Sequence, residues 1–204
     1  SLGVKEQRRL VPTRWSITAT DDTIAKKILE QVKYFNESNF LCYYGNYLGN
    51  YYLILLMPGM WTYELFEMFS PTKTNVWSKK KLNYATDYEG FNGRKNYAKE
   101  TSGGYYAAKL PIVEKLMQIK KQASVLALRF ITEEYETPLG VFVCREAVRK
   151  ALANKPLEFG SKELLLKYTH ALAKKKFGHD ISNIISKSML LKNYQKQKLL
   201  KSFL

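Results

Sequence analysis

The feature that most constrains the fold is a pair of aromatic and β-branched runs, Phe40 to Tyr47 and Asn50 to Met57. Runs of this composition are typical of β-strands, and the short connection Leu48-Gly49 between them predicts a hairpin. Pro58-Gly59 ends the second run. A chain with this hairpin must build a sheet, so the rest of the sequence has to supply what covers it.

Helical spacing of apolar residues dominates the rest of the chain and indicates helices around the sheet. The expected helices cover about residues 21–35, 104–122, 141–153, 161–176 and 181–194. Asp21-Asp22 would cap the first of them, because aspartate accepts hydrogen bonds from free backbone N–H groups. Pro111 in the second predicts a kink or a later start, since proline lacks a backbone N–H.

The remaining segments predict one strand and one loop, with one segment left ambiguous. Ser124 to Thr132 predicts a strand, while residues 61–69 fit either a short helix or a strand. Residues 70–101 are polar, contain Pro71, Gly90 and Gly93, and predict a long loop.

These elements predict an α+β fold, in which a mixed sheet with a hairpin packs against helices. A basic helical C-terminus and a flexible terminal peptide would follow. We therefore expect an α+β core over residues 1–160, a basic helical segment over 161–196 and a terminal peptide over 197–204.

Lysine and arginine outnumber the acidic residues, 33 against 18, for a formal net charge of +15. The excess is concentrated at the end of the chain, where residues 161–204 contain ten lysines but only Glu163 and Asp180 as acids. A charge balance of this size favours a polyanionic partner, most simply the phosphate backbone of nucleic acid. The alternative is a solvated, lysine-rich surface.

Cysteine and histidine are too few and too scattered to predict a metal site. Cys42, Cys144, His170 and His179 show none of the spacings of zinc ligands, and we expect both thiols to be reduced core residues. The sequence identifies no cofactor. No run approaches the ~18 apolar residues of a membrane span, so we expect no membrane partner and a cytoplasmic, nucleoid-associated location.

The last eight residues resemble the peptide that docks into the sliding clamp of DNA replication, the PIP-box. On a helical turn, Leu200, Phe203 and Leu204 would form one apolar plug, with Gln197 as a polar hook beside it. A peptide anchor of this kind predicts recruitment to a partner. The alternative is an amphipathic end to the last helix that packs on the chain's own core.

Three polar clusters are candidates for binding or chemistry. In the first, Arg14 and Trp15 precede Asp21-Asp22, where they could hold a phosphate or stack on a base. Paired aspartates could also hold a divalent metal, although helix capping is their commoner role.

The second cluster is the segment 87–95, which combines Asp87 and Glu89 with glycines and the basic pair Arg94-Lys95. Such a segment can bind phosphate, arrange a metal or simply connect two elements. The third runs from Glu100 to Tyr106, and its Gly103-Gly104 would expose backbone N–H groups at a positive helix end as an anion site. A tight turn is the alternative role of these glycines.

Further arginines are candidates for phosphate contacts. Arg145 and Arg149 lie one helical turn apart, so both side chains could contact the same phosphate. Arg129 is a further candidate. Salt bridges to Glu146 or Glu133 are the alternative. None of the clusters matches a Walker loop or a dinucleotide fingerprint, which disfavours an ATPase or a Rossmann enzyme.

Several runs together resemble the archaeal Nre family of DNA-repair proteins, and the resemblance covers nearly the whole chain. They are Leu10-Val11-Pro12-Thr13-Arg14-Trp15-Ser16-Ile17-Thr18-Ala19, Gly93 to Ala98, Gly103 to Ala108, Pro138 to Val141 and Arg145 to Arg149. The resemblance implies a role in the repair of damaged DNA and an interaction with the sliding clamp PCNA through a C-terminal PIP-box, here Gln197 to Leu204.

Two departures accompany this resemblance. Family members are longer and often carry an N-terminal Cys-rich, zinc-binding segment, so we expect this chain to be a fragment of a longer protein. Clamp motifs usually close with two aromatic residues, whereas this one closes with Phe203-Leu204, which predicts a smaller plug and weaker clamp binding.

The sequence therefore predicts a repair accessory protein that PCNA recruits and that holds DNA by basic surfaces. One alternative is a metal-dependent nuclease or nucleotide-processing enzyme that uses Asp87, Glu89 and Glu100 around Arg14 and Arg94. A second is a clamp-binding module with no DNA affinity of its own. Whether the chain has catalytic activity stays open.

Overall fold

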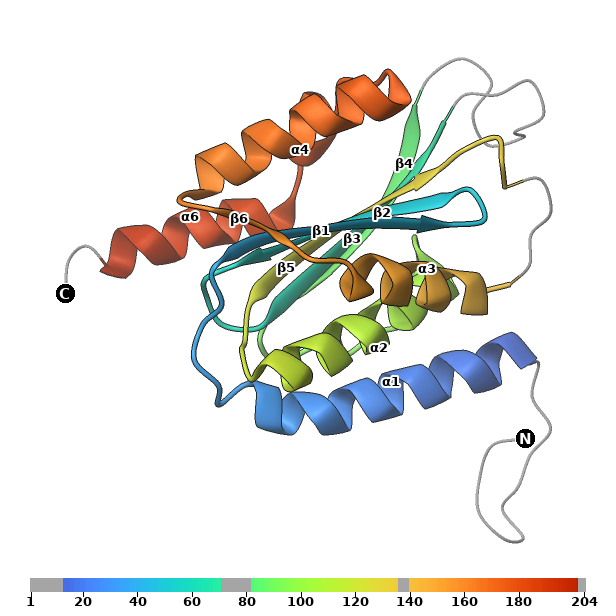
Figure 1. The fold of residues 1–204 in the computed structure, drawn as a ribbon. Helices are drawn as coiled ribbons and strands as arrows, with labels where there is room; N and C mark the ends of the chain where they lie inside the picture. The colour runs from blue at the N-terminus through green and yellow to red at the C-terminus, as the bar shows by residue number, and fades with distance from the viewer. Residues whose placement is uncertain (1–12, 71–81, 136–139, 202–204) are drawn as a thin grey trace, which may run out of the picture.

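The fold is built on a single six-stranded sheet with the strand order β4-β3-β5-β2-β1-β6 (Figure 1). The computed structural model describes residues 13–70, 82–135 and 140–201, and side chains within 15–195 of these. The strands are β1 (Phe40–Tyr47), β2 (Asn50–Met57), β3 (Thr62–Phe69), β4 (Asn83–Glu89), β5 (Ser124–Ile131) and β6 (Leu157–Phe159). Neighbouring strands are antiparallel except β3 and β5, which run parallel.

Helices cover both faces of this sheet (Figure 1). One layer contains α1 (Thr13–Val32), α2 (Ser102–Ile119) and α3 (Phe142–Ala153). The other contains α4 (Lys162–Phe177) and α6 (Met189–Lys201), with the short α5 (Ser182–Ile185) between them in the chain. The α+β fold with a mixed sheet, predicted from the sequence, is confirmed. No helix of the described residues has the length and apolar character needed to cross a membrane.

The central strand β2 shows why two helical layers are needed. Its side chains alternate between the faces, as in any strand, and every residue of the strand is buried. Ile54 packs in the cluster beneath α1, α2 and α3, whereas Leu53 and Leu55 pack with residues of α4 and α6 such as Leu165 and Leu190. The C-terminal segment therefore covers one face of the same sheet.

The predicted hairpin is present, with β1 paired antiparallel to β2. Leu48 and Gly49 form its turn with φ angles of 47° and 70°. Positive φ at both central residues matches the twist of a two-residue hairpin. Gly49 is also required by space, because a Cβ there would lie 2.5 Å from the backbone nitrogen of Tyr135.

Two sequence predictions about element boundaries are wrong. The first helix begins at Thr13 rather than at Asp21, so Asp21-Asp22 lie inside α1 and do not cap it. Ser and Thr residues before Asp21 imitate a helix start, but packing of α1 on α2 outweighs their weak local preference. Helix α2 also begins early, at Ser102, and continues through Pro111.

The predicted loop over residues 70–101 contains a strand, β4. Its sequence is polar because it lies at the edge of the sheet, where only β3 pairs with it. The ambiguous segment 61–69 is a strand, β3, and the three-residue strand β6 was not predicted at all. Residues 71–81 lie outside the described part of the chain.

A buried carboxylate attaches the last helix to the sheet. Glu64 of β3 accepts hydrogen bonds from the backbone nitrogens of Met189 and Leu190, at 3.1 and 3.0 Å, and from the hydroxyl of Ser188. A negative charge at a helix N-terminus is favourable, since it pairs with free N–H groups. The α6 backbone then continues to Lys201, inside the predicted terminal peptide.

Candidate functional site

A groove lies between α1 and the β4–α2 connection. Three adjoining hollows form it: the central one shares Asp22, Tyr97 and Tyr106 with the second hollow, and Trp15, Thr18 and Tyr97 with the third. The central hollow has a volume of about 440 Å³. A polar hollow of about 200 Å³ adjoins it at one end and a longer one of about 570 Å³ at the other.

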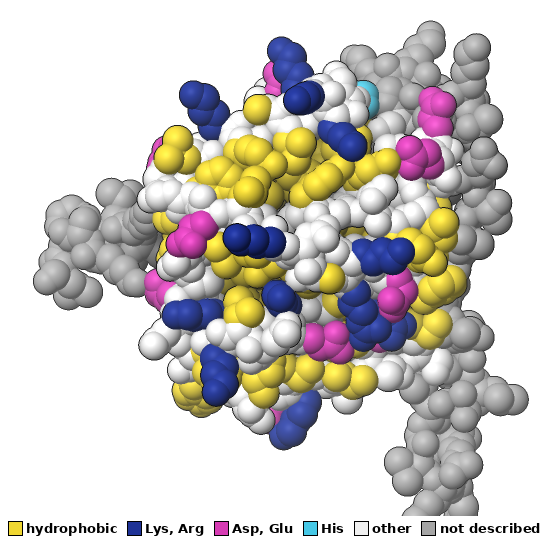
Figure 2. All heavy atoms as spheres, viewed as in Figure 1, with side chains coloured by type: hydrophobic (Ala, Val, Ile, Leu, Met, Phe, Trp, Pro, Cys, Tyr) yellow, Lys and Arg dark blue, Asp and Glu magenta, His cyan; other side chains and the backbone are white. Residues whose placement is uncertain are grey.

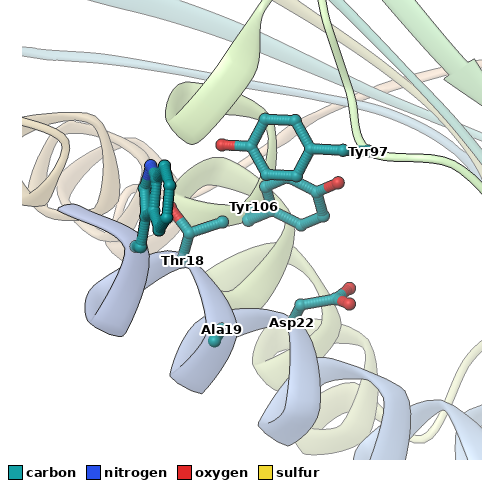
Figure 3. Close-up of a pocket in the computed structure, with 6 residues that line it drawn as sticks. Thr18, Ala19, Asp22, Tyr97 and Tyr106 are labelled. Atoms are coloured by element: carbon teal, nitrogen blue, oxygen red, sulfur yellow. The ribbon is translucent and has the colours of Figure 1, made fainter. Parts of the chain in front are cut away.

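Aromatic side chains line the central hollow. Trp15 at the start of α1 is 56% exposed and Tyr97 is 47% exposed, although both are large rings that usually become buried. Tyr106 of α2 is buried beside them, with its ring centre 5.1 Å from that of Tyr97. Figure 3 shows Thr18, Ala19 and Asp22 along one side of α1, facing these two tyrosines.

The connection that carries Tyr97 is held in place by Asp87 and Arg94. Their side chains form an ion pair of 2.8 Å, and Arg94 also donates to the backbone oxygen of Tyr88. The other oxygen of Asp87 accepts from the backbone nitrogens of Glu100 and Thr101 and from the Thr101 hydroxyl. Asp87 therefore ties the Arg94 segment to the start of α2.

Lys109 forms the floor of the polar hollow. Its ammonium group lies 3.0 Å from Asp22 Oδ1 and 3.2 Å from Glu89 Oε2, and the side chain is only 2% exposed. Glu89 also accepts a hydrogen bond from the indole nitrogen of Trp61. Lys26, on the surface, pairs with the second oxygen of Asp22 at 2.6 Å.

The two neighbouring aspartates of α1, Asp21 and Asp22, have pKa values shifted in opposite directions. Burial alone would raise the pKa of Asp22, but hydrogen bonds from Lys26 and Lys109 and their charges outweigh it and lower that pKa. Asp21 is fully buried and forms an ion pair with Arg145 of α3 at 3.1 Å. Burial raises the pKa of Asp21 despite this arginine.

The long hollow contains a buried ion pair between two strands. Arg129 of β5 donates to Glu67 of β3 at 2.6 Å, and its remaining nitrogens donate to Asn50. Gly104 of α2 lies directly against this pair, because a Cβ there would be 2.4 Å from Glu67 Oε1. Burial raises the pKa of the Cys144 thiol, which also lines this hollow, so the thiol stays protonated at neutral pH.

The structure brings several of the predicted site residues to the groove. Trp15, Arg94, Lys95, Gly103 and Gly104 all line it, as does Glu89. The Arg14 side chain lies outside the described residues, as do those of Gln197 and Leu200, and all of Phe203 and Leu204.

Other predicted residues lie elsewhere or in ion pairs. Both arginines form salt bridges: Arg149 pairs with Glu146, as one alternative expected, and with Glu114, whereas Arg145 pairs with Asp21, a partner that the sequence did not predict. Asp87 and Glu89 each have a cationic partner, and the Glu100 side chain is exposed. Within the described ranges, no group of three or more His, Cys, Asp or Glu side chains is arranged to hold a metal ion.

Sequence reasoning did not identify Tyr97 and Lys109 as groove residues, whereas Tyr106 belongs to the third predicted cluster, Glu100 to Tyr106. Lys109 gave one usable signal, since it is a lysine within the otherwise apolar helical run Tyr105 to Val113. Its partners Asp22 and Glu89 are 87 and 20 residues away in sequence, so only the fold brings them together.

Comparison with known proteins identifies the family. Residues 1–78 match the family described as "Archaeal Nre, N-terminal", and residues 89–203 match "Archaeal Nre, C-terminal". The chain belongs to the archaeal Nre family. In this Nre chain the groove lies between the two matched segments, because Trp15, Thr18 and Asp22 belong to the first, and Tyr97 and Tyr106 to the second.

Relatives with curated names span more than this Nre chain. It is 36% identical to the DNA repair protein NreB of Archaeoglobus fulgidus over 201 residues, 98% of the chain and 49% of that protein. It is 41% identical to the DNA repair protein NreA of Haloferax volcanii over 155 residues, 74% of the chain and 36% of the relative. The chain thus spans half or less of the length of these Nre proteins. No solved structure matches it significantly.

Proposed function

We propose that this chain is the part of a DNA-repair protein that binds DNA in the groove and binds the sliding clamp PCNA through Gln197 to Leu204. The role in repair is supported by the relatives, which are named DNA repair proteins. The observation that carries DNA binding is the combination of two exposed rings, Trp15 and Tyr97, with basic side chains at one groove.

The charges of the groove support a polyanion at its rim. Lys26 is exposed beside the polar hollow, and Lys95 lines that hollow without an ion pair among the described residues. Phosphate contacts of this kind supply most of the non-specific affinity for DNA and weaken as salt rises. Figure 2 shows Lys and Arg scattered over the viewed face with Asp and Glu among them, so charge on that face does not by itself mark a binding surface.

Binding is better supported than metal-dependent cleavage. A nuclease metal site needs carboxylate oxygens that are free to coordinate an ion. Asp87 and Glu89 instead use their oxygens on Arg94, Lys109 and backbone or indole N–H groups.

DNA binding is tested by titrating a labelled oligonucleotide at low and at moderate salt. The double substitution Lys26→Glu and Lys95→Glu should weaken binding about tenfold or more at low salt and reduce its salt dependence, because phosphate contacts are lost. Lys155→Glu, an exposed lysine beside β6, is the matched control and should change little. Equal binding by all three proteins would contradict the groove as the DNA surface.

The same titration separates the groove from the basic end of α4. Lys174, Lys175 and Lys176 lie in its last turn. If charge reversal of Lys174 and Lys175 abolishes binding while the groove variant binds normally, DNA lies on α4 instead. If the chain binds no DNA at any salt concentration, the result favours the alternative that it is a clamp-binding module without DNA affinity.

Clamp binding is supported by the spacing of Gln197, Leu200, Phe203 and Leu204. The end of α6 and the start of α1 lie on opposite sides of the molecule (Figure 1), so a clamp at one end would leave the groove accessible. Tethering of this kind raises the local concentration of a weak DNA binder. Phe203→Ala should abolish binding in a titration with purified PCNA, Lys198→Ala should preserve it, and equal affinities would contradict the proposal.

A further inference from the structure

The central hollow of the groove has a shape and chemistry that a DNA duplex cannot use. Its volume of about 440 Å³ lies within the ~300–1,000 Å³ of small-ligand sites. Three of its six lining residues, Trp15, Tyr97 and Tyr106, are aromatic, and aromatic rings stack on the flat face of a base. In a duplex those faces are covered by neighbouring base pairs, so a base must leave the stack to reach such a hollow.

We infer that the central hollow takes one unpaired base of single-stranded DNA, which enters between Trp15 and Tyr97. This inference rests on the proposed function and specifies its substrate as single-stranded DNA. Trp15 and Tyr97 come from the two different family segments and line the same hollow, each about half exposed. Insertion of a base would bury both ring surfaces at once.

The charges of the groove place the base inside and the phosphates outside. Asp22 and Glu89 line the polar end, where Lys109 pairs with both carboxylates and so offsets only part of their negative charge. A phosphate at this depth would approach two carboxylates, whereas a neutral base with amino groups would meet hydrogen-bond acceptors. Lys26 and Lys95 are exposed at the rim, where the charged backbone would pass.

The long hollow provides room for the next nucleotide. It continues from the central hollow past Thr18 and Tyr97 to Gly103 and Gly104. Gly103 and Gly104 also pack closely on neighbouring side chains, since a Cβ on Gly103 would lie 2.5 Å from Val141 Cγ1.

The test measures binding of a labelled single-stranded 12-mer, of the same strand in a duplex, and of competing deoxyadenosine monophosphate. The variants are Trp15→Ala and Tyr97→Ala, and Tyr97→Phe keeps the ring. Tyr34→Ala is the matched control, because Tyr34 is 89% exposed and lines none of the groove hollows. Urea midpoints equal to wild type show that each variant folds.

Each alanine variant should bind the single strand about 5- to 150-fold more weakly, the range for loss of one base–aromatic stack. Duplex binding should change less than twofold, and Tyr97→Phe and Tyr34→Ala should resemble wild type. Equal losses on duplex and single strand, or no loss at all, would overturn the inference. Deoxyadenosine monophosphate should compete more weakly than unlabelled 12-mer. Equally strong competition would also overturn the inference, since the site would then bind free nucleotides.

The outcomes separate this inference from the proposed function. Suppose that the wild type and Tyr97→Ala bind duplex and single strand equally well, while charge reversal of Lys26 and Lys95 weakens binding. This result would reject the base site and retain the DNA-binding groove. Absence of binding to either DNA at low salt would reject both.

Discussion

The ammonium group of Lys109 on α2 lies 3.0 Å from the carboxylate of Asp22 on α1, and this ion pair joins the two matched family segments. Glu89 completes a buried triad in which one cation faces two carboxylates. Helices α1 and α2 pack along each other, so the triad fixes the polar end of the groove between them.

Lys109→Met should destabilise the fold by about 3–5 kcal/mol, because removal of one partner leaves buried charge without compensation. Urea unfolding followed by circular dichroism measures this loss. Lys26→Met removes an exposed partner of the same aspartate and should cost less than ~1 kcal/mol. Similar losses for the two variants would show that the Lys109 triad is not a buried network in solution.

Substitution of Asp22 and of Asp21 should change the pH dependence of stability in opposite directions. The pKa of Asp22 is lowered, so its stabilising effect is full above the ordinary value of 3.8 and is lost as pH falls through the lowered value. Asp22→Asn should therefore be less stable than wild type at pH 7, and this deficit should shrink in acid.

The pKa of Asp21 is raised, so its contribution is full below 3.8 and is lost as pH rises through the raised value. Relative to Asp21→Asn, the wild type should therefore become less stable from acid toward neutral pH. Urea midpoints from about pH 2 to pH 7 measure both variants, and parallel curves for the two would contradict this assignment.

The sequence predicted elements that depend on neighbouring residues more reliably than contacts between distant ones. The β1–β2 hairpin was predicted because its turn and strands are contiguous. Strand β4 was not, since its polar residues become a strand only by pairing with β3. Trp15, Arg94 and Lys95 were identified from composition, but Tyr97 and Lys109 acquire their positions through residues far away in the chain.

Gly104→Ala should destabilise the fold by about 1–3 kcal/mol, because the added methyl group would collide with Glu67, which Arg129 holds in place. Gly160→Ala is the matched control, since a Cβ there would have no heavy atom within 4 Å. Thermal unfolding of both variants measures the difference. Equal midpoints would mean that Glu67 can move away freely.

Glu64→Ala should cost about 1.5–3 kcal/mol, the range for hydrogen bonds to a charged group. The substitution leaves the backbone nitrogens of Met189 and Leu190 without their acceptor at the start of α6. Amide hydrogen exchange should accelerate at these two residues before it does in β2. Unchanged protection there would contradict the attachment of α6 through Glu64.

The most direct test of the DNA-binding groove is to map where a single strand lies on the protein. An oligonucleotide with one photoreactive halogenated pyrimidine is crosslinked to the chain by ultraviolet light, and the attached peptides are identified by mass spectrometry. We predict crosslinks to Trp15, Tyr97 or Tyr106, which decrease when unlabelled single strand competes. Crosslinks confined to α4 or α6, with none on these three side chains, would contradict the account.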